Sequence, residues 1–350
     1  MPGITESELK KQIEKSEFAR LYFLYGEEKY MIRAYAKKLV SKAYAGGPRD
    51  FNLQKIDGAE ADVQQIASAV EAMPVLAERK CVEVSDLDAG ALRAAEAEKL
   101  WELFGSLPES CVLVMDLPTL SANVAKDRTW KKFLEKANKA GATVQVPLRS
   151  RTQMSRLLRA AAQKRGCSMD EKTASYMISQ CGGGLQNALN EMEKLCAYTG
   201  PGEITRQTVD ALTTKNLETK VFDLSRALLA GSCDKAYSIL NQLFYQNEEP
   251  VAILSVLSGA YLDLYRVKAS VQSGFSVMEP AKHFDYARKE FRLGNAERNA
   301  GNFSVPALRR SLDALCRADL ALKSARGNRR LVLEKLLAQL IWISESGGEA

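Results

Sequence analysis

The most informative absence in this chain is a glycine-rich phosphate loop after its first predicted β-strand. The strand predicted at Leu21–Tyr25 is followed by Gly26–Tyr30, in which a single glycine precedes two carboxylates, Glu27 and Glu28. A loop that binds nucleotide phosphates needs glycines, free backbone N–H groups and a Lys followed by Ser or Thr. The two carboxylates would repel a triphosphate. The sequence thus keeps the place of a nucleotide site but lacks its chemistry, and we expect no bound cofactor.

Histidine is scarce and cysteine is scattered. With one histidine, His283, the chain has almost nothing from which to build a histidine metal site or a Ser/His or Cys/His catalytic pair. Its seven cysteines never form a C-x-x-C pair, and an odd number cannot pair completely. We expect reduced core cysteines, an exposed or structural His283, no catalytic residue and no metal ligand.

Long hydrophobic runs are also missing. The longest weakly polar run, Ala252–Leu262, is interrupted by two serines and a glycine, and it is shorter than the ~20 apolar residues that a membrane span requires. The segment Met1–Glu6 has neither the basic start nor the apolar stretch of a secretory signal. We therefore expect no membrane segment and a cytoplasmic location.

The first part of the chain alternates predicted strands and helices. At 350 residues, 46% hydrophobic and 26% charged, the chain is long enough for two or three globular domains of ~100–200 residues each. Strands divided by helices indicate βαβ units and a parallel sheet covered on both faces, so residues 1–147 are predicted to form an α/β domain. The predicted strands are Leu21–Tyr25, Phe51–Ile56, Cys81–Val84, Cys111–Met115 and Thr143–Val146.

After Pro147 the pattern is helical only. Residues 148–214 are predicted to form a small three-helix lid, residues 215–345 an all-α bundle, and residues 346–350 a tail. In the bundle, leucines spaced near seven share one face of the helix Ser304–Ser324, as packed bundle helices do. The other predicted helices are Thr152–Arg165, Asp170–Gln180 and Gln186–Tyr198 in the lid, and Val221–Ala230, Cys233–Tyr245, Pro250–Ser270, Ala281–Leu293 and Arg329–Ser344 in the bundle.

The net charge of +6 is unevenly spread. From Phe284 to Leu333 there are eleven Lys and Arg against five Asp and Glu. A second cluster contains no acid and consists of Arg149, Arg151, Arg156, Arg159, Lys164 and Arg165. Such stretches suit contact with nucleic-acid phosphates, although a solvated helix face explains each of them equally well.

An α/β domain, a helical lid and a terminal bundle resemble the clamp-loader ATPases of the AAA+ class, and particular stretches narrow the resemblance. The chain is similar over nearly its whole length to the delta-subunit family of bacterial DNA polymerase III clamp loaders. The stretches that carry this similarity are Leu21–Glu28, Asn190–Tyr198, Val221–Leu224, Ala227–Gly231 and Arg317–Ser324 with Glu334 after it.

That family is ATPase-like in fold and inactive, and three positions agree with inactivity. The phosphate loop is absent, as described above. Val112–Asp116 resembles a Walker B strand, but Leu117 stands where the catalytic carboxylate would follow. Gly184–Leu189 resembles the nucleotide-sensing helix, but Gln186 replaces its arginine, and an amide cannot stabilise a transferring phosphoryl group as a guanidinium does. We expect no hydrolysis by this chain.

The family resemblance implies that the chain binds the sliding clamp (the beta subunit) and opens its ring for loading on primed DNA during replication. The matching hydrophobic wedge lies between a helix and a strand and consists of Met73, Pro74, Val75 and Leu76, with Arg79 beside it. Pro74 pre-sets the backbone, and two adjacent apolar side chains suit a pocket on a partner. Related wedges often carry phenylalanine, so this one buries less area. Without the resemblance, Val75 and Leu76 could equally plug the edge of the sheet.

The resemblance also implies other partners within the DNA polymerase holoenzyme, a nucleotidyltransferase assembly. The bundle is expected to pack against clamp-loader ATPase subunits and the delta-prime subunit in a collar, although some of its leucines must pack internally. Arg149, Arg151, Arg156 and Arg159 are candidates for contact with the phosphates of primer-template DNA. Two alternatives stay open: a divergent AAA+-like NTPase with weak nucleotide binding, and a stand-alone non-specific DNA-binding protein.

Overall fold

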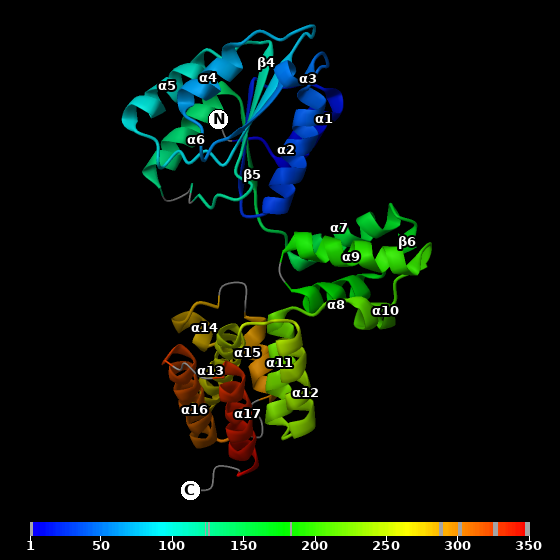
Figure 1. Cartoon of the computed structure of the whole chain (residues 1–350), viewed down its shortest axis with the longest axis vertical. Helices are drawn as coiled ribbons and strands as arrows, with labels where there is room; N and C mark the ends of the chain where they lie inside the picture. Colours follow the sequence, from blue (N-terminus) through cyan, green and yellow to red (C-terminus); the bar gives the residue numbers. More distant parts are fainter. Residues whose placement is uncertain are drawn as a thin grey trace. The chain divides into compact units, whose positions relative to one another are not determined.

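The computed structural model describes residues 3–122, 124, 127–182, 184–286, 290–299, 303–324 and 328–346. Two compact units make up the chain, with the elements labelled in Figure 1. We call them the N-terminal unit (Met1–Leu157 with Gly184–Gln186) and the C-terminal unit (Leu158–Gly183 with Asn187–Ala350). The division into three domains with a tail stays a prediction. The tail beyond Ser346 lies outside the described residues, as do Arg288, Lys289 and Arg326 of the basic stretch.

The N-terminal unit is built on a parallel five-stranded sheet in the order β2-β3-β4-β1-β5 (Figure 1). The inner strands are almost wholly buried, as expected where helices cover both faces of a parallel sheet. β2 is an edge strand and is only half-buried. These features confirm the predicted α/β fold. The strands are β1 (Leu21–Gly26), β2 (Leu53–Asp57), β3 (Lys80–Ser85), β4 (Cys111–Asp116) and β5 (Ala142–Val146).

Helices cover the sheet on two sides (Figure 1). One face packs against α4, α5 and α6 around an aromatic cluster in which the rings of Phe23 and Phe133 lie 4.8 Å apart, edge to face. The other face packs against α1 and α2 through aliphatic side chains. The helices are α1 (Glu6–Lys15), α2 (Lys29–Ala43), α3 (Arg49–Asn52), α4 (Val63–Glu71), α5 (Ala94–Gly105) and α6 (Arg128–Ala140).

Two parts of the N-terminal unit differ from the sequence prediction. The helix α1 was not predicted, although Thr5 and Glu8 form a capping box at its start. Phe51 and Asn52 were predicted to begin a strand, but they complete the single helical turn α3, whose backbone N–H groups bond the carbonyl of Pro48. Pro48 fixes the entry into that turn, so the strand β2 begins two residues later than predicted.

The segment after β5 contains more than the three predicted helices. These are present as α7 (Arg151–Gln163), α8 (Glu171–Cys181) and α9 (Leu185–Thr199), and a fourth, α10 (Arg206–Leu212), follows them. Strands were predicted to stop at Pro147, but β6 (Cys167–Ser168) and β7 (Gly202–Glu203) form a two-residue parallel ladder. Gly200 and Gly202 both have positive φ, which turns the chain back so that this short pairing can form.

The remaining helices form a bundle around one hydrophobic core. The predicted helix Ala281–Leu293 is wrong as a single element, because α14 ends at His283 and α15 begins at Phe291. Phe284 takes an extended backbone, and the chain brings the Tyr286 hydroxyl inward to a buried carboxylate. The helices are α11 (Leu217–Leu229), α12 (Cys233–Tyr245), α13 (Pro250–Gln272), α14 (Pro280–His283), α15 (Phe291–Asn299), α16 (Val305–Ser324) and α17 (Arg329–Glu345).

One helix of the described residues, α13, is long and apolar enough to cross a membrane by length and composition alone. Eight of its side chains are buried in the bundle, and they include the carboxylate of Asp263. Its most extensive helix neighbour is α16, another helix of the same core. Burial inside a helical bundle explains the apolar composition of α13, which we therefore treat as a core helix.

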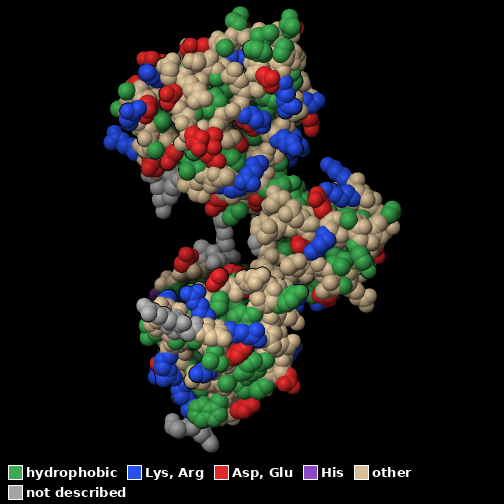
Figure 2. All heavy atoms as spheres, in the orientation of Figure 1, with side chains coloured by type: hydrophobic (Ala, Val, Ile, Leu, Met, Phe, Trp, Pro, Cys, Tyr) green, Lys and Arg blue, Asp and Glu red, His purple; other side chains and the backbone are tan. Residues whose placement is uncertain are grey.

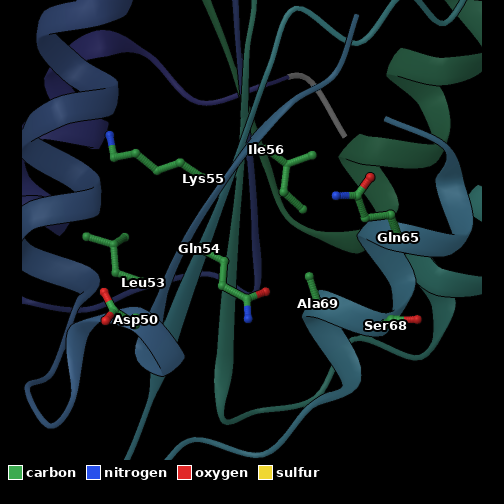
Figure 3. A pocket seen from close by; sticks show the side chains of 8 residues that line it. All are labelled: Asp50, Leu53, Gln54, Lys55, Ile56, Gln65, Ser68 and Ala69. Atoms are coloured by element: carbon green, nitrogen blue, oxygen red, sulfur yellow. The ribbon is translucent and has the colours of Figure 1, made fainter. Parts of the chain in front are cut away.

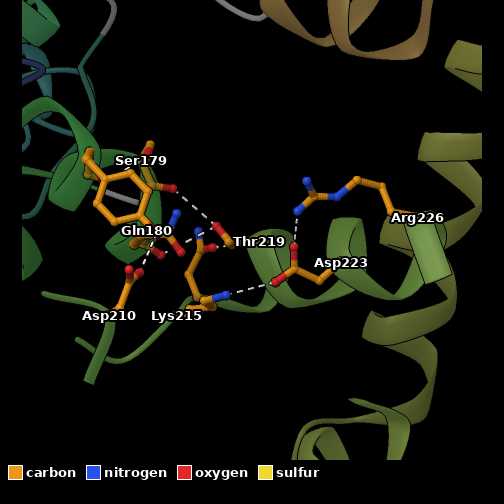
Figure 4. Close-up of polar contacts among 9 residues, drawn as sticks. Ser179, Gln180, Asp210, Lys215, Thr219, Asp223 and Arg226 are labelled. Atoms are coloured by element: carbon orange, nitrogen blue, oxygen red, sulfur yellow. Dashed lines mark hydrogen bonds and ion pairs between the residues drawn. The ribbon is translucent and has the colours of Figure 1, made fainter. Parts of the chain in front are cut away.

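Polar contacts join α8 to α11 within the C-terminal unit (Figure 4). The Thr219 hydroxyl donates to the carbonyl of Ser179 at 3.2 Å, and the Asn216 N–H donates to the carbonyl of Gln180 at 3.2 Å. The side chain of Asn216 also accepts from the Thr219 N–H and caps α11. Groups at the start of α11 thus donate to carbonyls in the last turn of α8, which have no partner within their own helix.

A buried ion pair in the bundle gives a first prediction. Asp263 accepts hydrogen bonds from the Tyr286 hydroxyl at 2.6 Å and from Arg292 Nε at 2.8 Å, and it is 4% exposed. Asp263→Ala leaves a partly buried guanidinium and a buried hydroxyl without their acceptor, so we expect the free energy of unfolding to fall by about 2–4 kcal/mol. Chemical denaturation measures this change. Asp313→Ala, which removes an exposed pair with Arg317, is the control and should cost less than about 1 kcal/mol; equal losses would contradict the argument.

Candidate functional site

The turn after β1, where a nucleotide site would lie, has its backbone N–H groups occupied. Those of Glu27 and Glu28 both donate to the carbonyl of Val146 on β5, at 3.1 and 3.2 Å. A Cβ on Gly26 would lie 2.2 Å from the same oxygen, and Gly26 has a φ of +138°. The single glycine therefore serves the close approach of this turn to β5. The N–H groups that a phosphate would need are bonded within the sheet.

Side chains of the same turn are also used internally. Lys29, the lysine that the NTPase alternative would require to bind phosphate, donates from Nζ to the carbonyls of Leu117, at 2.9 Å, and Leu120. Glu28 is 5% exposed at the start of α2, and burial raises the pKa of its carboxyl. A phosphate at this helix end would have to displace Glu28 and detach Lys29.

The Walker B-like strand ends in a carboxylate that is poorly placed for magnesium. Asp116 is 3% exposed and accepts a hydrogen bond from Ser85 Oγ at 2.8 Å. Burial raises the pKa of Asp116 to about 6, and the charges of Glu83 and Asp86 act in the same direction. Leu117 follows it and is buried. Within the part of the chain that the structure describes, no group of three or more His, Cys, Asp and Glu is placed to hold a metal ion.

The predicted wedge is an exposed apolar loop between α4 and β3. We call residues 73–79 the docking loop. Met73 is 77% exposed, Val75 38% and Leu76 89%, and Pro74 is half-buried. Figure 2 shows hydrophobic side chains gathered at the end of the N-terminal unit where α3 lies. Leu76 thus projects into solvent and does not plug the edge of the sheet.

Buried polar groups on either side hold the ends of the docking loop. The Lys80 side chain is fully buried, and its Nζ donates to the carbonyl of Ala69 in the last turn of α4. The amide of Asn52, also fully buried, exchanges hydrogen bonds with the backbone of Val75. Leu76 follows with a φ of +49°, a left-handed conformation that costs a non-glycine residue about 1–2 kcal/mol. The loop is exposed but anchored.

The structure places Arg79 away from the exposed tip. Its guanidinium lies 4.9 Å from the ring centre of Phe18, and its Nε is buried. Arg79 therefore packs against the body of the N-terminal unit by a cation–π contact. Its guanidinium does not lie at the exposed tip of the loop, and its part in clamp binding stays a prediction.

A pocket of about 530 Å³ lies beside the edge strand β2 (Figure 3). Its walls come from α3 and β2 on one side and from α4 on the other, the elements that anchor the docking loop. The lining residues are Asp50, Leu53, Gln54, Lys55, Ile56, Gln65, Ser68 and Ala69. Sequence reasoning did not find this pocket, because β2 alone gave no sign of how α4 crosses it.

The candidate phosphate contacts divide into two groups. Arg149 is bound to the carboxylate of Glu6 through both terminal nitrogens, and its side chain is 9% exposed. This ion pair makes Arg149 a structural residue of the N-terminal unit, which corrects its proposed role as a DNA contact. Arg151, Arg156 and Arg159 are exposed on α7, and their role stays a prediction.

Part of the basic stretch of the bundle pairs with acidic residues of its own helices. Arg292 binds Asp263, Arg317 binds Asp313 and Lys323 binds Asp319. These contacts favour the simpler explanation of the charge excess, a solvated and internally paired helix surface.

Two protein-family models match this chain. A family model described as "DNA polymerase III, delta subunit" matches residues 22–143, and one described as "DNA polymerase III delta subunit, C-terminal domain" matches residues 218–340. The chain belongs to the DNA polymerase III delta-subunit family. The first match spans β2, β3 and β4 in full, most of β1, the start of β5, the turn after β1 and the docking loop.

Similar proteins cover nearly all of the chain. The DNA polymerase III subunit delta of Bacillus subtilis (strain 168) is 25% identical over 338 residues, 95% of each chain. That of Escherichia coli (strain K12) is 26% identical over 310 residues, 87% of each. A solved structure described as the Bacillus subtilis DNA clamp loader delta protein has a TM-score of 0.61 at 22% identity, over 96% of this chain and 99% of that one, and it shows the shared fold.

The raised pKa of Asp116 gives a second prediction. The unfolded carboxyl ionises near pH 4, whereas the folded one holds its proton to about pH 6. The folded state therefore loses stability as pH rises from about 4 to 6, and the loss stays constant above that range. Asp116→Asn cannot ionise, so its stability relative to wild type should rise by about 1–3 kcal/mol over the same interval and then level off. Denaturation curves at several pH values test this; a difference independent of pH would refute it.

Proposed function

We propose that this delta-family chain is the clamp-binding subunit of a clamp loader and performs no ATP hydrolysis itself. It docks on the sliding clamp through the docking loop and holds one interface of the ring open for loading on primed DNA. The observation that carries the proposal is Leu76, an apolar side chain kept 89% exposed by an anchored backbone.

The expected binding energy follows from the exposure of the two wedge residues. Full burial of Leu76 against a partner contributes about 2 kcal/mol, and Val75, already more than half covered, adds about 1 kcal/mol. Met73, 77% exposed, adds an adaptable surface at the rim. A total near 3 kcal/mol corresponds to about a hundredfold in affinity.

A third prediction follows. Val75→Ser combined with Leu76→Ser should weaken binding of the isolated chain to its own sliding clamp about a hundredfold, because serine supplies little apolar area. A pull-down and a titration measure this. Tyr245→Ser is the matched control, since Tyr245 is equally exposed but lies on α12 of the bundle. A folded double variant that binds like wild type would remove the docking loop from the function.

Ring opening needs a readout of its own. Clamps closed around circular DNA should be released faster by the wild-type chain than by the double variant, without ATP. If the chain binds the clamp but does not accelerate its release, the proposal of clamp docking stands and that of ring opening is wrong.

The nucleotide-binding alternative gives a fourth prediction. The N–H groups of Glu27 and Glu28 and the ammonium of Lys29 already have protein acceptors, so a triphosphate would have to break several hydrogen bonds to enter. We expect no rise in the melting temperature of the chain at millimolar ATP and magnesium. A concentration-dependent rise would favour the divergent NTPase instead.

The other partners are proposed from exposed surfaces. Leu320 on α16 and Trp342 on α17 are 66% and 65% exposed, which suits packing against ATPase subunits and delta-prime in a collar. Arg151, Arg156 and Arg159 are the candidates for primer-template phosphates in the assembled complex. The isolated chain should then bind DNA weakly, whereas a stand-alone DNA-binding protein would bind it with a steep salt dependence. We propose a cytoplasmic location, because the proposed function belongs to DNA replication.

A further inference from the structure

We propose that Asn52 is the positioning residue of the clamp-docking surface: its buried side-chain amide fixes the backbone of Val75 and so sets where Leu76 projects. The inference rests on the proposed function and deepens it. Asn52 belongs to α3, more than twenty residues before the docking loop, and touches the partner at no point. Its effect on clamp binding would be exerted entirely through Val75.

The hydrogen bonds of Asn52 resemble those of a neighbouring strand. Its Nδ2 donates to the carbonyl of Val75 at 2.6 Å, and its Oδ1 accepts from the Val75 N–H at 2.8 Å. Nδ2 also donates to the carbonyl of Gly46 at 2.9 Å. A side chain that exchanges a donor and an acceptor with one residue fixes both peptide planes of that residue. Because Asn52 is 0% exposed, water cannot readily take its place.

The segment before α3 packs directly on the same backbone. A Cβ on Gly47 would lie 2.5 Å from both the carbonyl oxygen of Val75 and Nδ2 of Asn52, and 3.1 Å from the carbonyl oxygen of Leu76. Gly47 also has a φ of +75°, so glycine is required there for two reasons. By contrast a Cβ on Gly46, whose φ is +110°, would meet nothing within 4 Å. Alanine at Gly47 would add both backbone strain and a steric clash, whereas alanine at Gly46 would add backbone strain alone. Comparing the two substitutions therefore separates the effects.

The left-handed backbone of Leu76 explains why such an anchor is needed. A non-glycine residue leaves this conformation unless its surroundings hold it, and Leu76 itself makes few contacts because it is exposed. The anchor at Val75 is therefore the nearest restraint on the N-terminal side of Leu76. With it, the apolar side chain is ordered before the partner arrives, and less entropy is lost on binding.

The experiment compares the full-length chain in four forms against wild type. Asn52→Ala removes the anchor, and Gly47→Ala keeps Asn52 but places a Cβ 2.5 Å from both the Val75 carbonyl oxygen and Asn52 Nδ2, so it disturbs the hydrogen bond between them. The matched controls are Asn138→Ala, which removes an asparagine bonded to Thr143 elsewhere in the same unit, and Gly46→Ala, which adds strain without a clash. Affinity for the organism's sliding clamp and amide hydrogen exchange are measured for each.

We expect Asn52→Ala and Gly47→Ala to weaken clamp binding about tenfold and the two controls to change it less than about twofold. The Val75 amide should lose protection in both test variants, while the amide of Ile66 in α4 keeps it. Fast exchange at Ile66 as well would mean that the sheet domain itself is destabilised and would count against a positioning role. Gly47→Ala keeps the inference testable if Asn52→Ala does not fold.

The outcomes separate this inference from the proposed function. If Asn52→Ala and Gly47→Ala bind like wild type while the Val75 and Leu76 double serine variant does not, the positioning role is wrong and the docking loop stands. If the wild-type chain fails to bind the clamp, the proposed function itself fails. Weak binding by the test variants with an unchanged Val75 exchange rate would also overturn the inference.

Discussion

An apolar side chain stays in water only if its backbone is prevented from folding it inward, and this constraint organises the N-terminal unit. Burial of the Leu76 side chain against the half-buried strand β2, or in the pocket beside that strand, would be favourable in free energy. The side chain is kept out because residues on both sides of it are hydrogen-bonded to helices that flank the sheet: Val75 to Asn52 of α3, and Lys80 to the last turn of α4. Both anchors are buried polar groups, which are expensive to leave unpaired, so they resist rearrangement. The exposed tip depends on the most buried polar atoms of the unit.

The parallel sheet keeps the turn after β1 and the docking loop at opposite edges. In a parallel sheet all amino ends of the strands lie at one edge and all carboxyl ends at the other. The docking loop enters the amino end of β3, and Asn52 stands at the amino end of β2, whereas Glu28, Lys29 and Asp116 follow the carboxyl ends of β1 and β4. Strands of five or six residues separate the two edges by about 17–20 Å. Internal hydrogen bonds at the carboxyl edge of the sheet therefore leave the docking loop at the amino edge accessible.

The sequence predicted what depends on local pattern. Buried runs such as Cys111–Met115 predicted the strands. The prediction failed where a contact between residues far apart in the sequence determines the local structure. Tyr286 breaks the predicted helix Ala281–Leu293 because its hydroxyl reaches Asp263, and Arg149 is not free because Glu6, in a helix left unpredicted, binds it. The Thr5 and Glu8 capping box could have revealed that helix. Asn52 within the predicted strand Phe51–Ile56 was a signal against a strand at that position, because asparagine is depleted in strands.

Because Val75 and Leu76 are small, ordering of the loop before binding is more important here than in a wedge that carries phenylalanine. Val75 and Leu76 together offer about 3 kcal/mol of burial, and ordering a side chain on binding costs about 0.5–1.5 kcal/mol. A free loop would have to order both side chains and the left-handed backbone of Leu76 at once, which would consume most of that gain. The three hydrogen bonds of Asn52 are formed during folding and need not be made again at the interface. With so little apolar area to bury, the clamp affinity that we propose for this tip would depend as much on the buried amide beneath it as on the exposed side chains of Val75 and Leu76.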